Sequence, residues 1–193
     1  MTTNSKLPSP SPSQPWIQTF SGVAFDLLDP KPEQVRIEDI AHALARLCRY
    51  TGHCERYYSV AEHSILVASI LPPHLMFEGL MHDAIESYIG DLSSPLKVAM
   101  PEYRRIEAPI RRAVAERFGL EPDVPPLVKK SDMYMLEFER RRLLSKPPRD
   151  WNLPANDFEP QGIDVTLMCW KPRDAEREFL HHFEVLSKKE FAL

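Results

Sequence analysis

Charged and imidazole side chains interrupt two stretches of the chain whose helical stripes are otherwise apolar. Asp132 follows Val128 by four residues and precedes Met135 by three, so helical spacing places its carboxylate on the apolar stripe. The pair His82-Asp83 lies in the middle of a second apolar helical stretch. Because a buried, unpaired carboxylate is strongly disfavoured, these positions require either a bound cation or a dense set of hydrogen-bond donors.

Apolar residues recur at three- and four-residue intervals over most of the chain, a pattern typical of amphipathic α-helices. One helix begins with a capping box, in which Ser59 is the N-cap and Glu62 the third helical residue. The Pro-rich segment 146–172 predicts irregular structure. The predicted helices span about residues 36–48, 59–72, 75–88, 102–118, 126–145 and 172–188.

The N-terminal region differs from this helical remainder. Residues 1–15 are rich in Pro and Ser and nearly free of apolar side chains, which predicts a disordered tail. Within residues 16–28, Ser21-Gly22 lies between two short runs rich in aromatic and β-branched residues, which predicts a small β-hairpin. The sequence therefore predicts an all-α fold with one small N-terminal β-hairpin, arranged as a single domain over residues 16–193.

The composition argues against several classes of protein. A formal net charge of −4 is unsuited to a surface that coats nucleic acid. No apolar run approaches the roughly 18 residues that span a bilayer, and the N-terminus lacks the apolar segment of a signal peptide. The three cysteines are few and odd in number, which fits a reducing compartment. We therefore expect a cytoplasmic protein with neither nucleic acid nor membrane as a partner.

Two imidazoles and two carboxylates on three predicted helices form the strongest candidate site. Such a set suits a borderline transition metal and leaves coordination positions open for water and substrate. Any one of these residues could be a core residue with its own hydrogen-bond partner, but the set together favours one divalent metal. Mn, Fe, Co and Zn fit about equally. The candidate ligands are His63, His82, Asp83 and Asp132.

A structural zinc site is a weaker alternative. Cys48, His53 and Cys54 lie close together in the sequence, but the chain has no Cys-x-x-Cys pair and a fourth ligand would have to come from elsewhere.

The segments around the four candidate ligands resemble a known family. "VAEHS" contains His63, "HDAIESYIGDLSSPLK" begins at His82, and "KKSD" ends at Asp132. Together these segments are similar to the HD-domain phosphohydrolase superfamily, and in particular to its bacterial 5′-deoxynucleotidase branch. The resemblance covers about residues 45–140. The segment "FDLLDPKPEQVRIEDIAHAL" also looks like bacterial and phage HD proteins, some of which hydrolyse deoxynucleoside triphosphates.

The resemblance implies an HD-domain helical bundle that removes phosphate groups from nucleotides, preferably deoxynucleotides. It implies that the four candidate residues hold one metal, which activates water by lowering its pKa. Glu86 and Asp91 match acidic positions of the family segment, and the resemblance implies that they are catalytic residues that handle protons. The expected partner is therefore a small-molecule nucleotide.

Phosphate binding requires cations, and several lie in the matching segments. Lys97 corresponds to the lysine that closes the family segment and is a candidate for a phosphate contact. Arg49-Tyr50 occupies roughly the place of an Arg-Trp pair that lines the sugar and base in the deoxynucleotidases. Arg56 lies between this pair and His63. The substrate-binding candidates are therefore Arg49, Tyr50, Arg56 and Lys97, although each could also be an ordinary surface residue.

The sequence leaves the substrate and the activity open in several respects. A 5′-monophosphate and a triphosphate are both possible substrates. For a triphosphate, Lys129 and Lys130 could supply additional positive charge. A polyphosphate substrate could also bind together with a Mg ion. A non-catalytic HD module that binds a nucleotide as a signal is the main alternative. A cyclic-nucleotide phosphodiesterase would usually need a second metal, and the remaining histidines lack the spacing for one. Members of the superfamily commonly form larger assemblies, so we expect a homo-oligomer.

Overall fold

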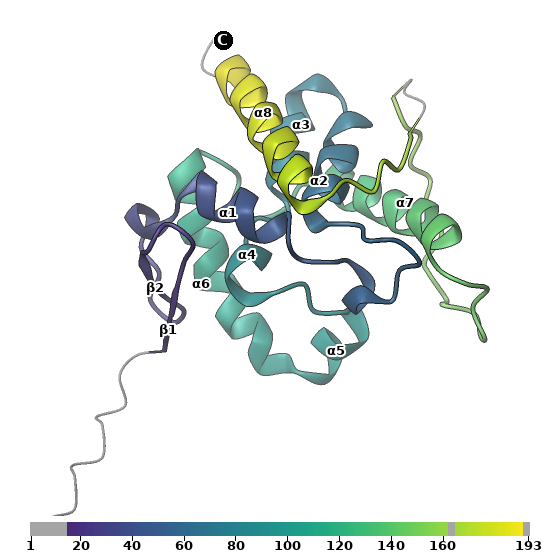
Figure 1. The fold of residues 1–193 in the computed structure, drawn as a ribbon, viewed down its shortest axis with the longest axis horizontal. Coiled ribbons are helices and arrows are strands. Elements are labelled where there is room, and N and C mark those ends of the chain that lie inside the picture. Colours follow the sequence, from purple (N-terminus) through teal and green to yellow (C-terminus); the bar gives the residue numbers. More distant parts are fainter. Residues whose placement is uncertain (1–14, 162–164, 191–193) are drawn as a thin grey trace, which may run out of the picture.

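The N-terminal strands form the small hairpin that the sequence predicts. The structure is a computed structural model that describes residues 15–161 and 165–190 (Figure 1). Strands β1 (Trp16–Gln18) and β2 (Ala24–Asp26) pair antiparallel, with Ile17 opposite Phe25. Gly22 occupies the turn with a φ of +83°, a conformation that suits glycine. The predicted tail falls, apart from Pro15, outside the described residues.

Helices make up the rest of the regular structure, so the expected helical fold class with one small sheet is confirmed. Short 3-10 turns lie at Pro32–Gln34, Tyr50–Gly52 and Pro73–Leu75. The α-helices are α1 (Ile37–Leu44), α2 (Val60–Ser69), α3 (Met76–Met81), α4 (Glu86–Ile89), α5 (Ser94–Ala99), α6 (Pro101–Phe118), α7 (Pro126–Leu143) and α8 (Pro172–Glu190). Within the described residues, none of these helices combines the length and the apolar character that crossing a membrane requires.

Helix α2 is buried on nearly all sides. Helices α3, α7 and α8 pack against it, while the hairpin and α7 lie on opposite sides of the molecule in Figure 1. The larger apolar core joins the hairpin, α1, α2, α3, α4, α6 and α8, and a smaller core lies between α2 and α7 around Val67, Val128 and Phe158. A polar side chain on α2 is therefore shielded from water and needs a partner inside the protein.

The start of α2 confirms one half of the predicted capping box and corrects the other. Ser59 Oγ accepts a hydrogen bond from the backbone amide of Glu62, as expected for an N-cap. The Glu62 carboxylate does not return to Ser59. Instead it accepts hydrogen bonds from the backbone amides of Met168, Cys169 and Trp170, at 2.7, 2.8 and 2.8 Å. Glu62 therefore anchors the irregular segment before α8 onto α2.

The predicted helix over residues 75–88 is wrong as a continuous element. Helix α3 ends at Met81, and a turn with i to i+3 hydrogen bonds leads into α4, so His82 and Asp83 lie between two helices. The ring of His82 hydrogen-bonds to the Gly79 carbonyl oxygen, the acceptor that a continuing helix would offer to the amide of Asp83. This side-chain bond gives a physical reason for the interruption.

A glycine allows α3 to lie close to α2. A Cβ atom on Gly79 would lie 2.5 Å from Leu71 Cδ1 and 3.0 Å from the Cα atom of Ala68. Only a residue without a side chain avoids this overlap. The close approach packs the middle of α3 against the C-terminal end of α2.

Other predicted boundaries differ modestly from the structure. Helix α1 ends at Leu44 rather than near residue 48, because Cys48 instead forms an isolated β-bridge with Ser59. Helix α5 was not predicted from the sequence. The Pro-rich segment before α8 lacks helices and strands in its described parts, as expected.

Candidate metal centre

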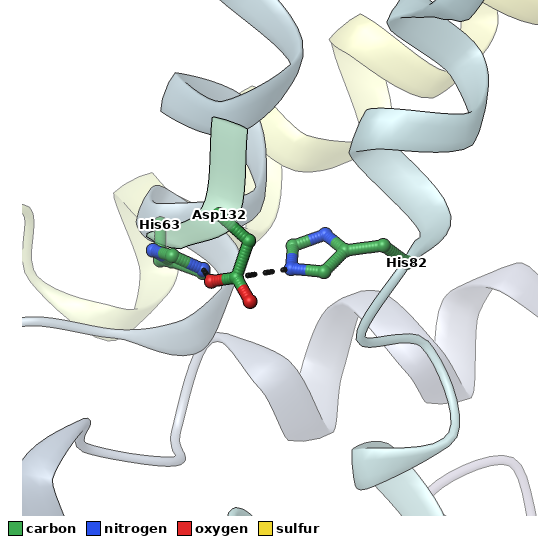
Figure 2. Close-up of side chains that lie close together, drawn as sticks. All are labelled: His63, His82 and Asp132. Atoms are coloured by element: carbon green, nitrogen blue, oxygen red, sulfur yellow. Dashed lines mark ion pairs between the residues drawn. The ribbon is translucent and has the colours of Figure 1, made fainter. Parts of the chain in front are cut away.

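Three predicted ligands converge from three parts of the fold. His63 comes from α2, His82 from the end of α3 and Asp132 from α7, and the Asp132 carboxylate lies between the two rings (Figure 2). Its Oδ1 atom is 3.1 Å from His63 Nε2 and 3.9 Å from His82 Nε2. One ligand atom of each residue lies within 4.8 Å of the others. This separation is short enough for one ion to contact all three.

The two imidazoles are oriented by hydrogen bonds on their far sides. His63 Nδ1 lies 2.7 Å from Glu139 Oε1, and His82 Nδ1 lies 2.8 Å from the Gly79 carbonyl oxygen. A carboxylate and a carbonyl accept hydrogen bonds, so each Nδ1 carries a proton and each Nε2 points toward the centre. Both Nε2 atoms are buried without a hydrogen-bond partner. These are the atoms left to bind a cation.

Asp83 lies beside the three converging residues. Its Oδ2 atom is 3.1 Å from His82 Nε2 and 3.8 Å from His63 Nε2. Burial alone would raise the pKa of Asp83, but His82, His63 and Arg49 outweigh burial and lower the pKa below its usual range. Asp83 is therefore an anion close enough to the centre to serve as a fourth ligand.

Asp132 is not buried, contrary to the expectation from helical spacing. Its side chain is 41% exposed. The buried stripe of α7 passes through Val128, Ser131, Met135 and Glu139, so Asp132 lies at the edge of this stripe. Ser131 takes the interior position and donates a hydrogen bond to the Val67 carbonyl. The centre is thus enclosed by the two histidines on one side and open at Asp132.

The donor set fits a divalent transition metal. Two imidazole nitrogens without other partners and nearby carboxylate oxygens are typical ligands for such ions. Burial and Arg49 lower the pKa of His63, but Glu139 and Asp132 outweigh them and raise it to about 9. The surrounding carboxylates therefore favour positive charge at this position, whether from a proton or from a metal ion.

Glu139 completes the centre and was missed by the sequence analysis. It is 0% exposed, and its Oε1 atom also accepts a hydrogen bond from the Tyr58 hydroxyl at 2.7 Å. Its Oε2 atom accepts hydrogen bonds from Arg49 Nε at 3.1 Å and from the Tyr50 hydroxyl at 3.2 Å. Burial would raise the pKa of Glu139, but the nearby cationic groups lower it, so the group stays ionised. The sequence signal was available, since Glu139 follows Asp132 by seven residues, or two helical turns.

The two predicted catalytic carboxylates lie beside the centre. Glu86 is buried and accepts a hydrogen bond from Lys97 Nζ at 3.2 Å through Oε1, while Oε2 has no hydrogen-bond partner. Burial, together with Asp83 and Asp91, raises the pKa of Glu86 well above its ordinary value. Burial likewise raises the pKa of Asp91. Both groups can therefore hold a proton more readily than an exposed carboxylate.

The predicted cations differ in their positions. Arg49 is buried, and its NH1 atom lies 3.9 Å from Asp83 Oδ2. Lys97 lies between Glu86 and Glu107, with Nζ 3.4 Å from the second carboxylate. Arg56 is exposed, and no hydrogen bond or ion pair joins it to the centre within the part of the chain described. Arg49 and Lys97 are therefore brought to the site, and Arg56 is not.

Tyr50 lies next to the site, but its hydroxyl already has partners. Its single proton is shared between the Leu136 carbonyl oxygen at 3.0 Å and Glu139 Oε2 at 3.2 Å. Tyr50 and Thr51 both have a φ of 55°, a left-handed conformation that is uncommon for residues other than glycine. The backbone after Arg49 is thus held in an unfavourable conformation, which occurs often at functional sites.

The weaker zinc alternative gains no support from the structure. Among residues 15–161 and 165–190, the single cluster of three or more potential metal ligands is that of His63, His82 and Asp132. Cys48, His53 and Cys54 do not form one.

Fold and site together define a largely helical protein that carries a candidate metal centre of His63, His82 and Asp132. No family model matches the chain. The chain is 37% identical over 179 residues to the uncharacterized protein YfdR of Escherichia coli (strain K12), and this alignment covers 90% of this chain and 96% of YfdR. It is also 37% identical over 126 residues to an uncharacterized protein of Rhodobacter capsulatus. This second alignment covers 60% of this chain and 64% of that protein. The chain therefore belongs to the YfdR family, and the names of both similar proteins state no activity.

Proposed function

We propose that this protein is an HD-domain phosphohydrolase that uses one divalent metal to release phosphate from nucleotides, preferably deoxynucleotides. The observation that carries the proposal is the pair of buried Nε2 atoms of His63 and His82, which lack hydrogen-bond partners and face the Asp132 carboxylate. The resemblance of these segments to the HD superfamily points to the same residues.

The metal would be held by His63, His82 and Asp132, with Asp83 as the fourth ligand. Mn, Fe, Co and Zn all suit this mixture of imidazole and carboxylate. When bound, a divalent cation lowers the pKa of a coordinated water and offsets negative charge on a phosphoryl group.

Arg49 and Lys97 are the cations that would bind the phosphate. The Nε atom of Arg49 donates to Glu139, which leaves its terminal nitrogens available on the side of Asp83. Lys97 is held between two carboxylates, Glu86 and Glu107. Cations already fixed in place lose little conformational entropy when a phosphate binds, which favours tight binding.

Glu86 and Asp91 would handle the protons of the reaction. The unpaired Oε2 atom of Glu86 and the raised pKa of its carboxyl let this group hold a proton more readily than an exposed carboxyl does. Such a group can donate this proton to the leaving oxygen of the nucleoside. Asp91, whose pKa is also raised, is the second candidate for this role.

The proposal covers both nucleotides with one phosphate and nucleotides with three. Arg49 and Lys97 are sufficient for one phosphate. For a triphosphate, Lys129 and Lys130 are the further candidates, although Lys130 pairs with Asp157 at 2.7 Å. Both substrate classes therefore belong in the test.

The test combines metal analysis with phosphate release from a panel of ribo- and deoxynucleotide mono- and triphosphates. We expect about one metal per chain and release of phosphate or polyphosphate from at least one deoxynucleotide. The variant His82→Gln should lose both metal and activity, whereas His74→Gln, at an exposed histidine of the Pro73–Leu75 turn, should keep both. Bound metal without release from any substrate would favour a nucleotide-binding module, and full activity in His82→Gln would refute the proposal.

A further inference from the structure

Glu139 contacts both a metal ligand, His63, and a phosphate-binding candidate, Arg49. Its Oε1 atom faces His63 Nδ1 and its Oε2 atom faces Arg49 Nε, at 2.7 and 3.1 Å. Each oxygen also accepts a hydrogen bond from a tyrosine, Tyr58 on Oε1 and Tyr50 on Oε2. Four donors therefore meet one carboxylate in a position that is closed to solvent.

Only a carboxylate can satisfy this arrangement. It offers two oxygens that accept hydrogen bonds and a negative charge that balances the buried guanidinium of Arg49. An amide in its place would present one oxygen and one NH2 group. If the oxygen faced His63, the NH2 group would face the Arg49 Nε–H group, where donor would meet donor.

The two imidazoles differ in what supports them. His82 donates to a neutral backbone carbonyl, whereas His63 donates to an ionised side chain. A hydrogen bond to a charged acceptor is stronger and increases the electron density that the opposite nitrogen offers to a metal. His63 therefore depends on a removable side chain for its orientation, and His82 does not.

We propose that Glu139 is a positioning residue of the metal centre, which fixes the His63 ring with Nε2 toward the cation and holds Arg49 beside the same site. This inference rests on the proposed metal binding, but not on the identity of the substrate. The Glu139 carboxylate therefore fixes the positions of His63 and Arg49 relative to each other.

The test measures metal affinity without turnover. Full-length protein is stripped with a chelator and titrated with Zn²⁺ by calorimetry, for the parent, Glu139→Gln and Tyr58→Phe. Loss of a group that orients a metal ligand typically costs about 10- to 100-fold in affinity, and we expect this loss in Glu139→Gln. Tyr58→Phe removes another donor from the same Oε1 atom but leaves the bond to His63, so its affinity should stay within about threefold of the parent.

A spectroscopic readout separates positioning from a general loss of stability. In the Zn²⁺-loaded parent, proton NMR should show the His63 Nδ1–H proton far downfield, because a buried carboxylate accepts its hydrogen bond. In Glu139→Gln this signal should move upfield, while the corresponding His82 signal should stay in place. If Glu139→Gln does not fold, both measurements are made on the double variant Arg49→Leu/Glu139→Gln. This variant also lacks the Arg49 guanidinium, which would otherwise be buried without a counter-charge.

The outcomes separate this inference from the proposed function. Unchanged Zn²⁺ affinity in the folded Glu139 variant, or a parent without the downfield His63 signal, would overturn the positioning role. A parent that binds Zn²⁺ as expected but hydrolyses no nucleotide with any tested metal would remove the proposed function and leave the positioning role intact.

Discussion

Replacing Glu62 by Gln tests how the segment before α8 is held on α2. The Glu62 side chain is 0% exposed, and its Oε1 atom accepts hydrogen bonds from the amides of Met168 and Cys169. Its Oε2 atom accepts a third from Trp170. In Glu62→Gln, the amide oxygen can keep the first two bonds, but the NH2 group would then face the Trp170 N–H group.

The expected cost follows from this geometry. One hydrogen bond to a charged acceptor is lost, worth about 1.5–3 kcal/mol, and the two that remain become neutral and weaker. Because Trp170 is only half-buried, water can partly replace the lost acceptor. We therefore expect the free energy of unfolding to fall by about 2 kcal/mol, which for a chain of this size lowers the Tm by about 4–8 °C.

The measurement is urea unfolding of metal-free protein, followed by circular dichroism, with Glu55→Gln as a control at an exposed residue of similar size. We expect the control to change stability by less than about 0.5 kcal/mol. A loss below about 0.5 kcal/mol in Glu62→Gln would refute the claim that these three hydrogen bonds anchor the segment.

Three further changes test the packing and charges of the site. Gly79→Ala should destabilise the protein by about 1–2 kcal/mol and weaken metal binding, because the new Cβ atom would push α3 away from α2; unchanged thermal unfolding would contradict this reasoning. Asp132→Asn should reduce metal affinity by at least about tenfold, yet change the stability of the metal-free protein by less than about 1 kcal/mol, since the side chain is 41% exposed. Equal affinities in a calorimetric titration would exclude Asp132 as a ligand. Arg49→Lys should raise the KM for a nucleotide substrate by about tenfold while about one metal per chain is kept, and an unchanged KM would show that Arg49 does not bind phosphate.

The fold was predictable where the pattern was strong and local. The capping serine at Ser59, the turn at Gly22 and most helices follow from short-range rules, and the structure confirms them. The break between α3 and α4 was not predictable from apolar spacing, because it depends on a side chain that bonds to the backbone at Gly79. Likewise, the partners of Glu62 lie more than 100 residues away in the sequence.

The candidate site was predictable in its members, but less so in its surroundings. Two histidines and two carboxylates were predicted together as ligands of one metal. The structure brings His63, His82 and Asp132 together, and Asp83 lies beside them. Asp132 was placed too deep, because helical spacing does not distinguish adjacent positions at the edge of a stripe. Glu139 was missed because a fully buried glutamate looks like an ordinary charged helix residue until its four donors are located.

The most direct test of the metal centre is a crystal structure of the protein purified with its native metal, with anomalous data collected above and below the absorption edge of the ion. We expect one anomalous peak within coordination distance of His63 Nε2, His82 Nε2 and the Asp132 carboxylate, with the His63 Nδ1 atom still bonded to Glu139. A metal-saturated crystal with no peak between these three side chains would contradict the account.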